Sequence, residues 1–190
     1  MAAKIILVVE DEKNIRERVV RWLESPEQIL LQAEHMVEAR EIMRDHWGDI
    51  GLIVMDVMLP KDENDAQEVK RLIEIREEAY NKWLGLEDKR QSDSDREWRK
   101  NRFAVDTLDR QIFDLLDTEG GIHLIQEHIN EEEKRLHIPV LYLTARESQS
   151  LMDEGLNLIA RDKSEWLVKP ITEEEFSSAV KRLLAKRKGE

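Results

Sequence analysis

Short runs of apolar residues recur along the chain, and a polar residue follows each run directly. The runs cover residues 5–9, 29–31, 52–55, 139–143 and 166–168. A strand that is apolar at every position is typical of a parallel sheet with helices on both faces, because neither side of such a strand meets water. The pattern therefore predicts a parallel sheet of five strands.

Segments in which apolar residues recur at helical spacing separate these strands. The predicted helices cover residues 14–24, 37–46, 122–129 and 147–160, with a last helix after Thr172. Thr172 and Glu175 have the spacing of a capping box, which marks the start of that last helix. Strands that alternate with helices over short connections form right-handed βαβ units. The predicted fold class is therefore α/β, a flavodoxin-like, doubly wound sheet of five parallel strands in the order 2-1-3-4-5.

The segment 61–119 breaks this alternation, because it is rich in charged residues and contains no strand-like run. Two series of apolar residues recur in it at helical spacing, namely Val69, Leu72, Ile73, Tyr80, Trp83 and Leu84, and then Trp98, Val105, Leu108, Ile112, Leu115 and Leu116. We predict a helical hairpin, 61–119, inserted between the third strand and the helix that follows it. The α/β domain would then consist of residues 1–60 and 120–190.

Two features of the inserted segment carry further expectations. Gly120 and Gly121 are expected to give a sharp stop before the sheet pattern resumes. Trp83 and Trp98 are expected to pack inside the hairpin, with the two apolar stripes facing each other. A surface for dimerisation or partner docking stays open as the functional alternative.

The composition limits the kinds of function. With 30 Lys and Arg against 42 Asp and Glu, the chain has a formal net charge of -12, which argues against direct binding of nucleic acid. There is no cysteine, so thiolate catalysis, thiolate metal sites and disulfides are excluded. The first apolar run is too short, and too closely followed by acidic residues, for a signal peptide or a membrane span. We expect a cytoplasmic protein that does not bind a membrane.

Charged and hydroxyl side chains stand where the predicted strands end. Glu10 and Asp11 follow the first strand, Asp56 the third, Thr144 the fourth and Lys169 the fifth. Because polar ligands collect beyond the carboxyl ends of parallel strands, these residues are expected to line one cleft. Clustered carboxylates need a cation to stay ionised together, and hard oxygen ligands favour Mg2+ over zinc. Asp56 is then a candidate nucleophile towards phosphorus, with the Lys169 ammonium offsetting charge on the transferred oxygens.

Four short motifs at these strand ends resemble the successive signatures of response-regulator receiver domains. They are Val-Val-Glu-Asp-Glu at 8–12, Met-Asp-Val-Met-Leu-Pro at 55–60, Leu-Thr-Ala at 143–145 and Trp-Leu-Val-Lys-Pro at 166–170. Each motif alone is weakly specific, but all four occur in order and at strand ends. The resemblance covers residues 1–60 and 120–187 and leaves the inserted segment unmatched.

The resemblance implies a role for each matching position around the phosphoacceptor. Asp56 matches the phosphoacceptor itself and a ligand of Mg2+. Glu10 and Asp11 match the acidic pair that holds this ion, and the backbone carbonyl of Met58 matches a further protein ligand. Lys169 matches the lysine that forms an ion pair at the site.

The resemblance also implies a switch. Thr144 matches the hydroxyl that moves towards the phosphoryl oxygens, and Trp166 matches the aromatic position that turns inward on activation. Met58 and Arg146 occupy positions that modulate the rate of dephosphorylation in the family. The Lys169-Pro170 bond matches a cis peptide, which proline makes much less costly.

The pathway implied is two-component signalling by a stand-alone, chemotaxis-type receiver. Phosphate would come from a sensor histidine kinase or a histidine phosphotransfer protein, and a downstream protein target would read the signal by contact. Residues 186–190 are too few for a helix-turn-helix, so any effect on transcription is expected to be indirect. The protein is then a phosphoacceptor signalling domain and not an enzyme, beyond its own phosphorylation and dephosphorylation. For a homodimer, the candidate surfaces are the hairpin, and residues 147–160 and 166–168 with the last helix.

Three alternatives stay open at this point. A phosphorelay intermediate differs from a terminal switch only in passing the phosphoryl group from Asp56 to a histidine protein. A degenerate receiver would keep the fold and use the hairpin to bind a partner constitutively. An aspartyl-phosphate phosphatase usually has a second Asp two residues after the nucleophile; Met58 occupies that position here, which makes this alternative the weakest.

Overall fold

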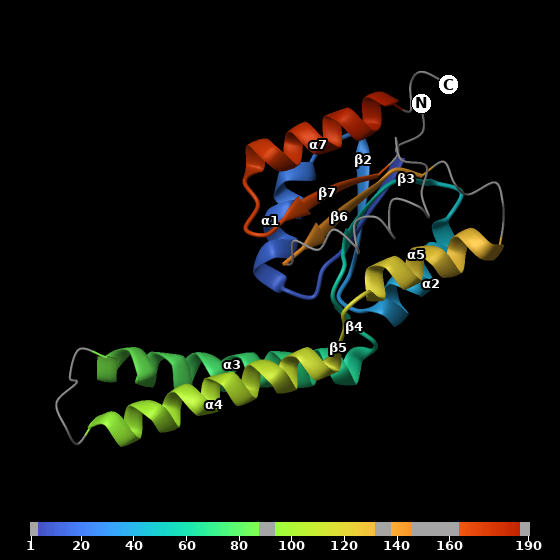
Figure 1. Cartoon of the computed structure of the whole chain (residues 1–190). Helices are drawn as coiled ribbons and strands as arrows, with labels where there is room; N and C mark the ends of the chain where they lie inside the picture. The colour runs from blue at the N-terminus through green and yellow to red at the C-terminus, as the bar shows by residue number, and fades with distance from the viewer. Residues whose placement is uncertain (1–3, 88–93, 132–137, 146–163, 187–190) are drawn as a thin grey trace.

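The computed structural model describes residues 4–87, 94–131, 138–145 and 164–186 of the chain (Figure 1). A central sheet lies between helices on both faces, and a long pair of helices projects away from it. Arg146 and the predicted helix over 147–160 lie outside the described residues. Within those residues, no helix combines the length and apolar character needed to cross a membrane.

The central sheet has five parallel strands in the order β2-β1-β3-β6-β7. Their bounds are Gln28–Ala33 for β2, Lys4–Val9 for β1, Ile50–Asp56 for β3, Val140–Thr144 for β6 and Ser164–Val168 for β7. Counted along the chain within this sheet, the order is the predicted 2-1-3-4-5, so the predicted fold class is confirmed. All seven residues of β3 are buried, as its position in the middle of the sheet requires.

Alternate residues of each strand pack on opposite faces of the sheet. In β1, Leu7 and Val9 belong to a core shared with α2 and α5, whereas Ile6 and Val8 belong to a core shared with α1 and α7. These helices are α1 (Lys13–Leu23), α2 (Met36–His46), α5 (Gly120–Glu131) and α7 (Glu173–Lys186). Figure 1 shows the two pairs on opposite sides of the sheet. Because each buried large apolar side chain contributes about 1.5–3 kcal/mol, a strand between two helical layers is stabilised from both faces.

The last helix begins where the capping pattern predicts. The Thr172 amide donates to Glu175 Oε2 at 3.0 Å, and the Glu175 amide donates to Thr172 Oγ1 at 3.3 Å. Phe176 is fully buried and its ring lies 5.4 Å from that of Trp22 on α1. The cap and this contact fix the start of α7, and with it the short connection from β7 that carries Lys169.

The inserted segment forms two long helices, α3 (Glu63–Glu87) and α4 (Ser94–Leu115), which run side by side away from the sheet (Figure 1). Val69, Leu72, Trp98 and Val105 are buried between them. The rings of Trp83 and Trp98 lie 6.0 Å apart, so the tryptophans pack inside the hairpin as predicted.

A short antiparallel ribbon closes the base of the hairpin. Its strands are β4 (Leu59–Pro60) and β5 (Leu116–Asp117), with Leu59 opposite Asp117 and Pro60 opposite Leu116. No strand was predicted for residues 61–119, where β5 lies, because a strand of two residues leaves no periodic pattern. The ribbon brings both ends of the hairpin together, so the chain leaves and returns to the sheet at one place.

The two glycines do not have the position that the sequence suggested. Instead of ending the second hairpin helix, which stops at Leu115, Gly120 and Gly121 form the first turn of α5. A Cβ at Gly121 would lie 2.1 Å from the Asp56 carbonyl oxygen, and the Gly121 amide donates to Val57 O at 3.1 Å. Gly121 is therefore required by a close backbone approach and not by a chain stop.

Candidate functional site

The predicted site residues stand at the carboxyl edge of the sheet. Glu10 comes directly after β1, Asp56 ends β3, Thr144 ends β6 and Lys169 comes directly after β7. These four strands are neighbours in the sheet and all run in the same direction. The topology therefore brings together side chains that are up to 159 residues apart in the sequence.

Lys169 is the centre of the polar contacts in this site. Its Nζ lies 2.5 Å from Asp56 Oδ2, and 2.9 Å and 2.8 Å from the two carboxylate oxygens of Glu10. The Glu10 residue is fully buried and Asp56 is 4% exposed, so these contacts are shielded from water. One ammonium group thus bridges two buried carboxylates that come from different strands.

Three carboxylates, from Glu10, Asp11 and Asp56, have ligand oxygens within 4.8 Å of one another. Burial, and then the charge of Asp56, raise the pKa of Asp11 to about 6. The same two causes raise the pKa of the Glu10 carboxyl well above its ordinary value. Burial disfavours the charged Lys169 ammonium, but the charges of Asp56 and Glu10 outweigh it and raise the pKa of Lys169. The site therefore has an excess of negative charge that its lysine does not fully neutralise.

This donor set fits a divalent cation. All three side chains offer hard carboxylate oxygens, which Mg2+ prefers, and a cation would relieve the repulsion that raises the pKa values of Glu10 and Asp11. Glu10 Oε2 accepts no hydrogen bond of good geometry from the described residues, although it lies close to Lys169, so it can serve as a ligand. The carbonyl of Met58 stays a predicted ligand; the Met58 amide donates to Asp56 Oδ1 at 3.0 Å, which holds this loop near the carboxylate.

Thr144 and the residues around it join the strand ends. Thr144 is buried, and its carbonyl accepts a hydrogen bond from the Lys169 amide at 2.7 Å. The Leu143 carbonyl accepts one from the Val57 amide at 3.0 Å. The Lys169-Pro170 peptide is cis, as expected. The loops after β3, β6 and β7 are therefore connected through their backbones next to Asp56.

Trp166 lies beside this cluster, within β7. Its ring stacks on Tyr142 of β6, with centroids 4.4 Å apart and planes inclined by 25°. Trp166 is partly buried against the core on the α2 and α5 side of the sheet, and its indole N–H has no hydrogen-bond partner among the described residues. Within the described parts of the chain, the side chain is thus held by stacking and by apolar contact.

Two residues next to the site were not predicted to belong to it. Arg16 of α1 is buried and donates to the carbonyl of Glu10 at 2.7 Å. Its position beside Ile15, one turn after Glu12, was the only signal that it faces the acidic loop. Gly121 packs on the Asp56 backbone, and a glycine pair next to a predicted helix was too common a pattern to reveal that contact.

No protein-family model matches the sequence, and no curated protein matches it. Solved structures do match the fold. A CheY-like response regulator receiver domain protein from Methanospirillum hungatei JF-1 is 15% identical, with a TM-score of 0.58 and coverage of 98% of this chain and 97% of that chain. Chemotaxis protein CheY4 from Vibrio cholerae is 17% identical, with a TM-score of 0.57 and coverage of 96% and 100%. A structure from a CheX-CheY-BeF3-Mg2+ complex of Borrelia burgdorferi is 12% identical, with a TM-score of 0.54 and coverage of 96% and 88%.

Proposed function

We propose that this chain, which has the fold of response-regulator receiver domains, is a phosphorylation-dependent response regulator of a two-component system. Asp56 accepts the phosphoryl group, and Glu10, Asp11 and the Met58 carbonyl hold Mg2+ beside it. The protein signals in the cytoplasm by contact with another protein. It is a phosphoacceptor domain, with no catalysis beyond its own phosphorylation and dephosphorylation.

One observation carries this proposal, namely the bridge that Lys169 makes between Asp56 and Glu10. The second oxygen of Asp56, Oδ1, accepts a hydrogen bond from the Met58 amide, and the Asp56 carboxylate lies close to those of Glu10 and Asp11. A carboxylate placed in this way can attack phosphorus in line. The ammonium of Lys169 then offsets the charge on the transferred oxygens.

Each residue of the site has a separate role in the proposed phosphoryl transfer. Asp56 supplies the attacking oxygen and forms the bond to phosphorus, and the donor's leaving group departs with the bonding electron pair. Glu10 and Asp11 hold the cation, which when bound neutralises charge on the phosphoryl oxygens. Lys169 pairs with the phosphoryl oxygens and keeps the Asp56 carboxylate oriented.

Phosphorylation would reach the surface through Thr144 and Trp166. The new phosphoryl oxygens attract the Thr144 hydroxyl, and movement of the loop after β6 frees space towards which the Trp166 ring turns. The stacked pair of Trp166 and Tyr142 is suited to such a change, because no described polar contact anchors the indole. A target that binds one of the two arrangements more tightly then reads the phosphorylated state.

The central test is incubation with Mg2+ and acetyl phosphate, followed by intact-mass measurement. We expect a phosphoryl adduct on the wild-type protein and none on Asp56→Asn. Asp45→Asn is the matched control, because Asp45 is an exposed aspartate that pairs only with its neighbour Arg44 among the described residues. An adduct that persists in Asp56→Asn, or that disappears in Asp45→Asn, would contradict the assignment.

Transfer of labelled phosphate separates a phosphorelay intermediate from a terminal switch. A histidine kinase or phosphotransfer protein should load Asp56, and loss of the label to a second histidine protein would identify a relay.

We further propose that residues 1–60 and 120–190 form the receiver and 61–119 a separate inserted hairpin. The ribbon of Leu59 and Pro60 with Leu116 and Asp117 supports this division, because it joins the two ends of the hairpin where the chain leaves and re-enters the receiver.

A further inference from the structure

A chain of polar contacts begins at Arg16 and leads away from the site. Arg16 is 6% exposed, and its Nη1 donates to the carbonyl oxygens of Glu10 at 2.7 Å and Asp11 at 3.4 Å. These carbonyls belong to the acidic pair proposed to hold Mg2+. Arg16 therefore fixes the backbone from which both carboxylates project.

The second arm of the Arg16 guanidinium leads to the hairpin. Nη2 lies 2.5 Å from Glu34 Oε1, and Glu34 Oε2 accepts a hydrogen bond from Lys70 of α3. The hydrogen bond from Lys70, and the charge of Arg16, lower the pKa of Glu34 although partial burial opposes this. Glu34 is thus an ionised link between a buried arginine of the receiver and a lysine in the second turn of the hairpin.

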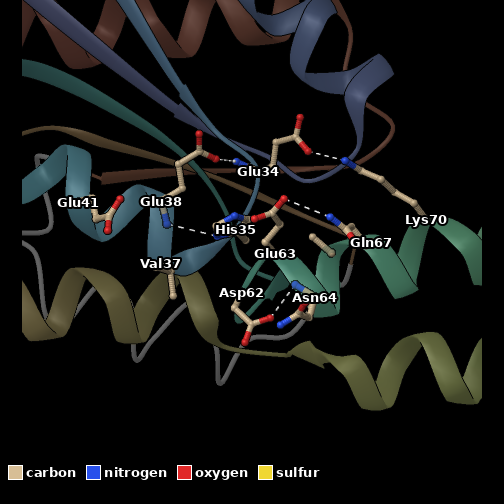
Figure 2. A pocket seen from close by; sticks show the side chains of 11 residues that line it. Glu34, His35, Val37, Glu38, Glu41, Asp62, Glu63, Asn64, Gln67 and Lys70 are labelled. Carbon is tan, nitrogen blue, oxygen red and sulfur yellow. Dashed lines mark hydrogen bonds and ion pairs between the residues drawn. The ribbon is translucent and has the colours of Figure 1, made fainter.

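A pocket lies where the start of the hairpin packs against the receiver part of the chain, and this contact region is called the seat of the hairpin. A cavity of about 630 Å³ lies between the start of α2 and the first two turns of α3. Figure 2 shows the side chains that line it, with Lys70 reaching Glu34 at one side. Five carboxylates line it, from Glu34, Glu38, Glu41, Asp62 and Glu63, and Lys70 is its single lysine or arginine among the described residues. Carboxylates on both walls repel one another. The Lys70 contact opposes this repulsion, together with the hydrogen bond from the Val37 amide to the Lys61 carbonyl at 3.2 Å.

We propose that Lys70, Glu34 and Arg16 are positioning residues that tie the hairpin to the acidic loop. The seating of the hairpin and the occupancy of the Asp56 site are therefore linked. A partner that pulls the hairpin away from α2 breaks the Lys70 contact and loosens the Glu10 and Asp11 backbone. Linkage is reciprocal, so a cation bound at the acidic pair also stabilises the seated hairpin. The link to phosphoryl transfer rests on the proposed function, whereas the tie itself does not.

The size of the effect follows from exposure. The Lys70 side chain is 50% exposed and that of Glu34 35%, so their pair is a weak, salt-screened contact. Arg16 is buried, so loss of its partner Glu34 has the larger effect. We therefore expect substitution of Lys70 to change the amide exchange rate and the Mg2+ affinity by about two- to fivefold, and substitution of Glu34 to change them by more.

The first test uses hydrogen–deuterium exchange of the metal-free protein. In Lys70→Met the peptide covering residues 10–16 should exchange about two- to fivefold faster than in the wild type. Lys70→Arg should restore the wild-type rate, because it keeps a cation at this position. Lys82→Met is the matched control, since Lys82 is also an exposed lysine of α3 that pairs with a glutamate.

The second test measures the affinity for Mg2+ by calorimetry. Lys70→Met should weaken binding by about two- to fivefold relative to Lys82→Met, which has the same net charge. Glu34→Gln should weaken it further. The double variant of Lys70 and Glu34 should bind no more weakly than Glu34→Gln alone, because among the described residues Lys70 reaches the acidic loop through Glu34. Additive losses would overturn the proposed order of contacts.

The outcomes separate this inference from the proposed function. Faster exchange in Lys70→Met, together with no phosphoryl adduct on Asp56 in the wild type, would support the contacts that join Lys70, Glu34 and Arg16 and would contradict the proposed function. Normal phosphorylation of Asp56, with Lys70→Met indistinguishable from Lys82→Met in exchange and Mg2+ affinity, would remove the tie and keep the proposed function.

Discussion

The close contact between Gly121 and the Asp56 backbone predicts a large loss of stability in Gly121→Ala. The added Cβ would lie 2.1 Å from the Asp56 carbonyl oxygen and 2.7 Å from Met55 Cγ. Real Cβ contacts essentially never fall under 3.0 Å, so the two backbones must separate by about 0.9 Å. The Met55 side chain can rotate, but the Asp56 carbonyl belongs to the central strand and cannot.

The cost of this separation combines two terms. Overpacking in a well-packed core costs about 1–3 kcal/mol, and a shift of α5 also strains the hydrogen bond from the Gly121 amide to Val57. We expect Gly121→Ala to lose about 3 kcal/mol of unfolding free energy. Because the clash is with the backbone of Asp56 itself, phosphorylation by acetyl phosphate should also slow in the fraction that folds.

Urea unfolding followed by far-ultraviolet circular dichroism measures this loss, and intact-mass kinetics measures the phosphorylation rate. Gly48→Ala is the control, because a Cβ there would meet nothing within 4 Å. Gly85→Ala is a second control within α3, where replacement of a helical glycine by alanine should add about 0.5–1 kcal/mol. If Gly121→Ala proved as stable as Gly48→Ala, the close packing of α5 on Asp56 would be wrong.

Three further predictions concern the charges and the insertion. Lys169→Met should cost about 3–5 kcal/mol of stability in a chelator, by leaving buried carboxylates unpaired, and added Mg2+ should restore part of it in urea titrations. The Asp11 pKa is raised from 3.8 to about 6, so the folded metal-free protein keeps a proton that the unfolded chain releases, and stability falls as the pH rises through this window. Asp11→Asn should therefore add about 1–3 kcal/mol near pH 7.5 without metal and almost nothing near pH 4, measured by urea unfolding at both pH values. Replacing residues 61–115 by Asn-Gly, which suits a tight turn between Pro60 and Leu116, should leave a protein that folds and accepts phosphate on Asp56, checked by calorimetry and intact mass.

The sheet could be predicted from the sequence because each central strand is buried on both faces. Residues 5–9 and 52–55 are continuously apolar for this reason, and the structure extends the second of these runs to β3, Ile50–Asp56. The ends of the strands were less certain, since Gln28 and Ser164 are polar and carry no apolar signal. The alternation of strands and helices indicated a parallel sheet with right-handed crossovers, which more than one strand order satisfies. The order itself followed from assigning the flavodoxin-like architecture to this alternation.

The charged residues of the candidate site could be predicted, but the residues that position them could not. Glu10, Asp56 and Lys169 stand at strand ends, where a parallel topology must bring them together. Their bridging geometry depends on side-chain conformations that no pattern reveals. Arg16 and Gly121 act through backbone atoms of other residues, and such contacts depend on tertiary packing alone.

The hairpin is connected to Asp56 and the acidic loop in three ways that its place in the chain explains. It begins immediately after Pro60, four residues from Asp56, and it returns to α5 where Gly121 rests on the Asp56 carbonyl. Lys70 adds a third connection through Glu34 to the acidic loop. The ribbon at the base keeps the two ends of the hairpin together, next to the loop that follows β3. Because both ends of the hairpin meet the sheet at this ribbon, a change in the position of the hairpin would act first on the loop next to Asp56, the proposed phosphoacceptor.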